Sequence, residues 1–389
     1  MPQAASAPLT VPLAAAGAAA LALGALASNH GARIVVLFAV GIALGATLHH
    51  SAFGFASAYR RLIERRGTHG VRAQLLMLAA ASALFAPLLS QGAWLGRDVV
   101  GAIAPASLQV AAGAFLFGIG MQLAGGCGSG TLYAAGGGQL RMAVTLVAFC
   151  AGSFWASLHM DLWARLPAPE ALALGETIGW PSALTVQLAV LAALYALLGR
   201  VRGADLDRRP VGPMGARRIL HGPWPPAAGA LMLAALNVLT LMVAGHPWTI
   251  TWAFTLWGAK IARGFGWSPE GDPFWSAEFQ RHALEAGVLA DVTSVMNLGL
   301  VIGAIAAAGL AGGFRLRFGP SPRAALAAAL GGLAMGYGAR IAYGCNVGAF
   351  FSGVASTSLH GWLWIAAALP GSWVALRFMR IWLPDSSAP

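Results

Sequence analysis

Charged residues are scarce in this sequence. Asp, Glu, Lys and Arg make up 10% of the 389 residues, whereas hydrophobic residues make up 58%. A soluble protein carries about 25% charged residues, so most of this chain does not face water. Apolar runs of about 20 residues, the length that a helix needs to cross a bilayer, recur along the chain. Because the alternating pattern of an outer-membrane barrel is missing, helices are the expected spanning elements.

Cysteine and lysine are also rare, with three cysteines and the single lysine Lys260. Three cysteines cannot build a disulfide framework, and their spacing fits no zinc site, so we expect no metal and no cofactor. The net charge of +11 comes mainly from arginines in short loops between apolar runs. Membrane topology explains such arginines, and we therefore reject a nucleic-acid partner.

The apolar runs predict an all-α polytopic membrane protein. Three pieces, 52–63, 128–139 and 347–358, are too short to cross a bilayer alone and follow a glycine or a polar break. Such pieces are typical of broken or re-entrant helices. The predicted spans are 9–27, 33–49, 71–93, 108–124, 142–160, 181–200, 226–245, 287–311, 323–343 and 361–380. No positive cluster precedes the first span, so we expect it to stay as a membrane helix rather than act as a cleaved signal peptide.

The arginines predict the orientation of these spans, because loops rich in Lys and Arg stay in the cytoplasm. Arginine clusters occur in loops 60–72, 200–218, 315–323 and 377–380, whereas acidic residues gather in 161–176 and 270–285. We therefore expect a multi-pass protein of the bacterial inner membrane with both termini in the cytoplasm. Its single transmembrane domain has halves at roughly 8–200 and 220–381, joined by the basic cytoplasmic loop 200–220. The path of 246–286 does not follow from the charge pattern.

Two segments of the chain resemble each other. Residues 118–130 read GIGMQLAGGCGSG and residues 336–348 read GYGARIAYGCNVG, with six of thirteen positions identical. Two of the three cysteines, Cys127 and Cys345, fall in register, which indicates an internal repeat. The first copy runs from an outside start to the cytoplasmic Arg141, and the second from the cytoplasmic Arg323 to an outside end. The copies therefore predict an inverted repeat, in which broken helices meet at a site near the bilayer midplane.

The two Gly-Cys-x-x-Gly loops are candidate substrate loops. Their glycines let the chain turn, and the helix that follows each loop begins with free backbone N–H groups that attract an anion. Each thiol adds a weak, polarizable donor suited to a sulfur atom. The alternative is close helix packing by small residues, but two cysteines in register favour the substrate site. The candidate binding residues are Cys127, Cys345, Gly126, Gly128, Gly130, Gly344, Asn346 and Gly348.

Several other residues carry weaker signals. Gln122 and Arg340 occupy matching positions of the repeat and are candidate pathway residues, since charges at membrane depth usually have a use. Lys260 is expected to extend its charge to an interface. Cys150 has no partner in the repeat and is interpreted as a core cysteine, and His49 and His50 as residues at a helix boundary.

At these loops the sequence resembles the YeeE/YedE family of sulfur-compound transporters. The resemblance also covers residues 51–60 (SAFGFASAYR) and 289–297 (LADVTSVMN). It implies a pseudo-symmetric helical fold with short re-entrant helices, and thiosulfate contacted by Cys127 and Cys345. Where members of that family carry a third cysteine near the N-terminus, this chain has Gly54, which is the third candidate pathway position.

We therefore expect a transporter, not an enzyme, that takes up a small sulfur-containing anion, thiosulfate or a related compound. A cytoplasmic sulfur-accepting protein is a candidate partner beside the lipid bilayer. The alternative is a membrane thiol or sulfur-transfer protein with Cys127 and Cys345 as a redox pair. Against it, the sequence places no activating His, Asp or second Cys beside either thiol.

Overall fold

The computed structural model describes residues 10–201, 214–317 and 321–382. Within these ranges nine segments are helical, long and apolar enough to cross a membrane, so the chain is an all-α polytopic membrane protein. Arg202, Arg208 and Arg209 of the predicted basic loop lie outside the described residues. The long helices are α1 (Thr10–Ser51), α3 (His69–Gln91), α4 (Leu108–Ala124), α6 (Leu140–Ser157), α9 (Trp180–Arg200), α11 (Pro226–Ala244), α15 (Val292–Leu310), α16 (Pro322–Ile341) and α18 (Leu359–Trp382).

The first two predicted spans both belong to α1, and a break in this helix separates them. Gly31 interrupts it with a backbone conformation (φ 77°, ψ 170°) that lies outside the helical region and that glycine adopts at little cost. Helix α1 therefore consists of two helical segments, and the break lies between the predicted spans 9–27 and 33–49. The remaining eight predicted spans each match one long helix within a few residues.

All three short pieces that the sequence predicted are present as short helices. They are α2 (Phe55–Arg65), α5 (Gly128–Gly136), and the π-helix η2 (Asn346–Phe351) continued by α17 (Ser352–Ala355). Each follows a long helix after a few non-helical residues. The other short elements are β1 (Ala93–Trp94), β2 (Arg97–Asp98), α7 (Met160–Ala164), α8 (Leu174–Thr177), α10 (Ala216–His221), α12 (Thr251–Gly264), α13 (Pro273–Ser276), α14 (Glu278–Glu285) and the 3-10 turn η1 (Val288–Ala290).

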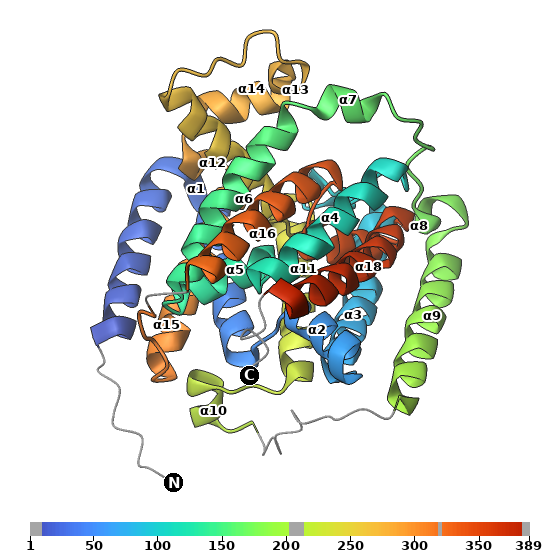
Figure 1. Cartoon of the computed structure of the whole chain (residues 1–389), viewed down its shortest axis with the longest axis horizontal. Helices are drawn as coiled ribbons and strands as arrows, with labels where there is room; N and C mark the ends of the chain where they lie inside the picture. The colour runs from blue at the N-terminus through green and yellow to red at the C-terminus, as the bar shows by residue number, and fades with distance from the viewer. Residues whose placement is uncertain (1–9, 202–213, 318–320, 383–389) are drawn as a thin grey trace.

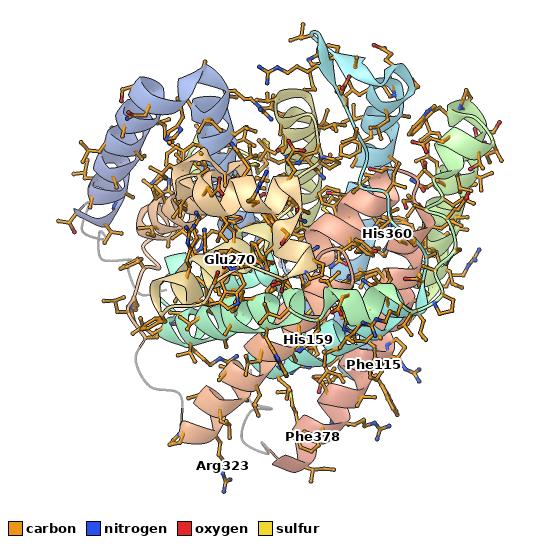
Figure 2. All side chains as sticks on the ribbon, turned by 90° about the horizontal axis from the view of Figure 1, so that it is seen from above. Phe115, His159, Glu270, Arg323, His360 and Phe378 are labelled. Carbon is orange, nitrogen blue, oxygen red and sulfur yellow. The ribbon has the colours of Figure 1, made fainter. Side chains whose placement is uncertain are left out.

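The connecting elements gather on two opposite faces of the helix bundle. Helices α7, α13 and α14, which contain parts of the acidic segments 161–176 and 270–285, lie at the top of Figure 1, and the arginine-rich α2 and α10 lie near the bottom. We call these the upper face and the lower face. Seen from above, α16 and α18 project beyond the rest of the bundle, where Arg323 and Phe378 lie (Figure 2).

Glycines allow the central helices to pack at short range. Along α4 and α16, Gly120 faces the backbone of Gly331 and Met335, and a Cβ added there would overlap these atoms. Gly338 faces Gly113 and Phe117 in the same way, so α4 and α16 run antiparallel. Small residues at such contacts let helix backbones approach closely where lipid offers no hydrophobic driving force.

The segment 246–286, whose path the charge pattern left open, enters the bundle and returns to the upper face. After α11 ends at Gly245, the non-helical residues 246–250 reach the interior, where Trp248 and Ile250 are fully buried. Helix α12 begins there, has 14 residues, and leads to α13 and α14 at the upper face. This helix is too short to cross a membrane by itself.

Candidate functional site

The first Gly-Cys loop ends where the short helix α5 begins. Cys127 is the N-cap residue of α5, and its Sγ accepts a hydrogen bond from the backbone N–H of Gly130 at 3.4 Å. Its side chain is 2% exposed. The thiol therefore lies beside the free N–H groups at the positive end of the helix dipole.

The second loop repeats this arrangement. Cys345 is the N-cap residue of η2, and its Sγ accepts a hydrogen bond from the backbone N–H of Val347 at 3.5 Å. Gly344 before it has φ 149°, a conformation in which an L side chain is strained. The side chains of Cys345 and Asn346 are both fully buried. The matching glycine and cysteine thus have the same local function in both loops, a turn followed by a helix cap.

The structure brings the two loops into contact. A Cβ added to Gly128 would lie 3.3 Å from the Sγ of Cys345 and 3.7 Å from its Cβ. Because Gly128 has no side chain, the space beside it stays open, and the Cys345 thiol faces this space. The other predicted binding residues are buried around this contact, namely Gly126, Gly130, Gly344, Asn346 and Gly348. Two helix N-termini and two thiols, from segments far apart in the sequence, thus share one buried region.

Gly54 occupies the corresponding position of a third short helix. It is the N-cap residue of α2 and has extended backbone dihedrals, φ −131° and ψ 125°. A Cβ at this position would lie 2.7 Å from the Oγ of Ser57 and 3.7 Å from the hydroxyl of Tyr133 in α5. Hydroxyl groups therefore surround the position at which α2 begins. Sequence reasoning missed both Ser57 and Tyr133, because neither belongs to the glycine-cysteine pattern.

Two polar contacts fix α2 against the rest of the site. The Nδ2 of Asn346 donates to the Tyr59 hydroxyl at 3.5 Å, and the Nε2 of Gln122 donates to the Ala56 carbonyl at 3.2 Å. Gln122 is 1% exposed. Its amide therefore ties α4 to α2 and lies at the edge of the thiol region.

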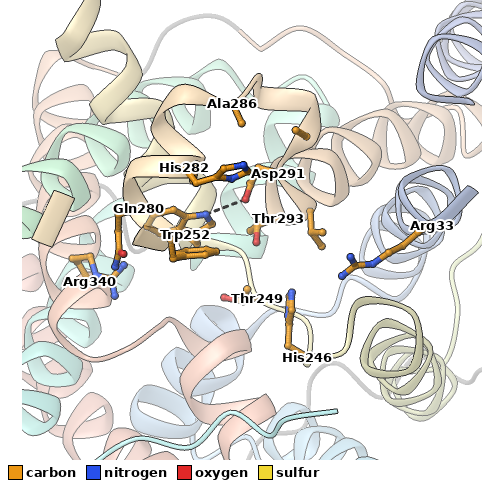
Figure 3. Close-up of a pocket in the computed structure, with 14 residues that line it drawn as sticks. Arg33, His246, Thr249, Trp252, Gln280, His282, Ala286, Asp291, Thr293 and Arg340 are labelled. Atoms are coloured by element: carbon orange, nitrogen blue, oxygen red, sulfur yellow. Dashed lines mark hydrogen bonds between the residues drawn. The ribbon is translucent and has the colours of Figure 1, made fainter. Parts of the chain in front are cut away.

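Arg340 lies apart from the two thiols. It lines a cavity of about 550 Å³ that also touches α14 at the upper face, and Gln122 does not line this cavity (Figure 3). The matching positions Gln122 and Arg340 thus have different surroundings. The residues that line the cavity are Arg33, His246, Thr249, Trp252, Phe279, Gln280, His282, Ala283, Ala286, Ala290, Asp291, Val292, Thr293 and Arg340.

One wall of this cavity touches the second Gly-Cys loop. A Cβ at Gly348 would lie 2.8 Å from the Oγ1 of Thr249, which lines the cavity. Thr249 belongs to the non-helical segment 246–250. Thr249 therefore contacts both the cavity and the second Gly-Cys loop, at a glycine three residues after Cys345. Thr249 is a third residue that sequence reasoning missed.

Two buried asparagines and a serine hold the segment 246–250 in place. The Oδ1 of Asn237 accepts from the backbone N–H of Trp248 at 2.7 Å, and the Nδ2 of Asn297 donates to the Ile250 carbonyl at 3.0 Å. The Oγ of Ser352 donates to the Trp248 carbonyl at 2.8 Å. These side chains replace the hydrogen bonds that a helix would supply, as backbone at membrane depth requires.

The ionisable groups near the upper face have their own partners. The Nδ1 of His246 lies within hydrogen-bonding distance of the Pro247 carbonyl, at 3.0 Å. Burial lowers the pKa of Lys260. The Nζ of Lys260 donates to the carbonyls of Leu284 and Ala286 at 2.8 and 2.6 Å, which fixes the turn after α14.

Cys150 lies in α6, away from both loops. It is 7% exposed, and Gly258 of α12 packs against its backbone carbonyl. All three cysteines are free thiols. Among the described residues, no three His, Cys, Asp or Glu side chains are placed to hold a metal ion.

Comparison with known proteins gives one matched region that includes both Gly-Cys loops and Gly54. A sequence model described as "Sulphur transport" matches residues 50–374. The probable transporter YedE of Escherichia coli is 35% identical over 155 residues, 40% of this chain and 38% of that protein, so the match spans less than half of YedE. The thiosulfate transporter TsuA of Spirochaeta thermophila is 28% identical over 350 residues, 86% of this chain and 95% of that protein. TsuA of Escherichia coli is 25% identical over 285 residues, covering 68% and 72%.

Proposed function

Because the chain belongs to the sulphur-transport family, we propose that it transports a small sulfur-containing anion, thiosulfate or a related compound, across the bacterial inner membrane. The contact between Gly128 and the Cys345 thiol carries this proposal, since it joins the two Gly-Cys-x-x-Gly loops. The names of the TsuA relatives support thiosulfate as the first candidate.

The chemistry of the meeting loops suits such an anion. The N-termini of α5 and η2 offer backbone N–H groups to the negative charge, and the two thiols beside them are buried. A thiol is a soft, polarizable group that competes well with water for a sulfur atom, whereas a sulfate oxygen gains little from it. The thiols therefore supply the preference for sulfur, and the helix ends supply the attraction for the anion.

The loops also suit release of the solute. Neither loop contains an arginine, and partial charges at helix ends hold an anion less strongly than a buried guanidinium does. A transporter needs binding that is weak enough for the solute to leave the site. At Gly54 the Ser57 hydroxyl donates to the Gly54 carbonyl at 3.2 Å, and the Tyr133 hydroxyl lies 3.7 Å from the position of an added Cβ.

We further infer that the halves 8–200 and 220–381 are inverted copies around this site. Gly120 and Gly338 are matching positions of the repeat, as are Gly113 and Gly331. Gly120 faces Gly331, and Gly338 faces Gly113. Exchange of the two copies therefore turns the Gly120–Gly331 contact into the Gly338–Gly113 contact. Two copies related by a two-fold axis in the membrane plane must have this property.

The preference for sulfur is tested by competition. Vesicles that contain the purified protein should take up radiolabelled thiosulfate without any added acceptor or reductant, which a thiol-transfer protein would require. Unlabelled sulfate should inhibit at a concentration at least about tenfold higher than unlabelled thiosulfate, equivalent to about 1.4 kcal/mol. An organic persulfide should compete better than sulfate. Equal inhibition by sulfate and thiosulfate would show that the thiols do not select the solute.

The proposed orientation places the lower face in the cytoplasm and the upper face outside, because the arginine-rich helices α2 and α10 lie at the lower face. In a variant without native cysteines, Glu270→Cys should react with an impermeant maleimide added to intact cells. Arg65→Cys should react only after the membrane is opened. Both positions are exposed, so accessibility alone does not separate them. Labelling of Arg65→Cys in intact cells would reverse the orientation.

A further inference from the structure

Arg340 is a charged side chain whose surroundings leave it incompletely partnered. It lies in the last turn of α16, and its Nε is buried without a hydrogen-bond partner. Its guanidinium lies over the ring of Phe274 at 5.1 Å, a contact that contributes modestly and accepts no hydrogen bond in the plane of the guanidinium. Within the described part of the chain, no carboxylate forms a salt bridge with Arg340. A partly buried charge without a salt-bridge partner is costly in a membrane protein and points to a functional site.

The other charged groups of the same cavity already have protein partners. Arg33 donates to the carbonyls of Val243 and Ala244 at 3.1 and 2.7 Å, at the C-terminal end of α11. Asp291 caps α15 by accepting from the Ser294 N–H at 2.7 Å, and it also accepts from the Trp252 indole N–H at 3.0 Å (Figure 3). Arg340 therefore differs from these groups in having donors that face the cavity and remain available for a ligand.

We propose that Arg340 forms a capture site for a small oxyanion in the cavity at the upper face, separate from the thiol region. A guanidinium offers paired N–H donors that match two oxygens of a sulfonate, sulfate or thiosulfate group. Gln280, Thr249 and Thr293 line the same cavity and add neutral hydrogen-bonding groups. The bound anion supplies Arg340 with a negatively charged partner, since Asp291 in the same cavity is engaged by Ser294 and Trp252.

This site recognises oxygen atoms and therefore does not select for sulfur. The cavity and the thiol region then recognise different parts of a thiosulfate ion. The cavity binds its oxygens, and the two loops bind its terminal sulfur. Thr249 connects them, since it lines the cavity and touches Gly348. The direction of this passage rests on the proposed transport function, whereas anion binding in the cavity does not.

Binding is tested on the purified protein with sulfate as the probe. Sulfate should raise the melting temperature of the wild-type protein, and Arg340→Gln should lose most of this increase. Arg340→Lys, which keeps the charge but not the paired donors, should keep part of it. Arg281→Gln is the matched control, because Arg281 is an exposed arginine of α14 that does not line the cavity. It should respond to sulfate as the wild type does. An unchanged response in Arg340→Gln would overturn the proposal.

Transport provides a second measurement. Arg340→Gln should raise the thiosulfate concentration for half-maximal uptake about tenfold, which corresponds to about 1.4 kcal/mol of lost binding, and leave the maximal rate largely unchanged. The weak inhibition of uptake by sulfate should also disappear in this variant.

If Arg340→Gln folds poorly, Gln280→Ala provides a milder change in the same cavity and should weaken the response to sulfate. If the wild type takes up no thiosulfate, the transport function fails, and the sulfate-binding experiment still decides whether the capture site exists.

Discussion

Replacement of Cys345 by alanine is expected to reduce thiosulfate uptake to the level of vesicles without protein, and Cys127→Ala is expected to do the same. Both thiols cap the helix that follows them, and Cys345 faces Gly128 of the other loop. A solute between the loops would meet both sulfur atoms. Removal of either one takes away the donor that competes with water for the terminal sulfur of thiosulfate.

The loss of transport should not come from a loss of folded protein. Each substitution removes one buried sulfur atom and one long N–H···S hydrogen bond, which costs about 1–2 kcal/mol. Size-exclusion profiles and melting temperatures should therefore stay close to those of the wild type. Uptake of radiolabelled thiosulfate into vesicles, measured at equal amounts of incorporated protein, is the decisive comparison.

Cys150→Ala is the matched control, because Cys150 is a similarly buried thiol that lies in α6 and caps no helix in the site. Its uptake should be close to that of the wild type. Normal transport by both Cys127→Ala and Cys345→Ala would remove the thiols from the site. A serine at either position keeps a hydroxyl that can cap the helix, so Cys345→Ser should retain the fold and a small part of the activity.

The membrane fold was predictable because lipid leaves few solutions for a long apolar run. The lengths of the long helices follow from the bilayer thickness, and the three short helices follow from glycine and polar breaks between the runs. The merging of two predicted spans into α1 did not follow. Gly31 is the non-helical residue at this break. A single glycine in a sequence does not show whether a helix ends there or continues after a bend.

The candidate site was predictable to the extent that its two loops repeat each other in the sequence. The chain has only three cysteines, so the match between Cys127 and Cys345 indicated two related loops. The structure brings these loops together. The segment 246–250 has no such counterpart. Its fold depends on Asn237 and Asn297, which lie far away in the sequence on α11 and α15. A polar amide inside an apolar run signals a partner but does not identify which backbone group it binds.

Gly120→Leu and Gly338→Leu are expected to prevent folding to a similar extent. At Gly120 a Cβ would overlap backbone atoms of Gly331, and at Gly338 it would overlap backbone atoms of Gly113. Overpacking of a core costs about 1–3 kcal/mol when side chains can move aside. Here the obstacle is the backbone of the neighbouring helix, so α4 and α16 would have to separate, and the cost should exceed that range. The yield of monodisperse protein in detergent measures the effect.

The equality of the two effects tests the inverted copies. Gly120 and Gly338 occupy matching positions, and the glycines that they contact, Gly331 and Gly113, also match, so exchange of the two copies leaves the contact unchanged. Gly24→Leu is the control, because Gly24 lies in a helix with no atom within 4 Å of an added Cβ. That variant should fold normally, since the added side chain points away from the bundle. Tolerance of leucine at one of the two central positions, together with loss of folding at the other, would show that the copies do not pack as equivalents. The symmetry would then be a property of the sequence motif alone.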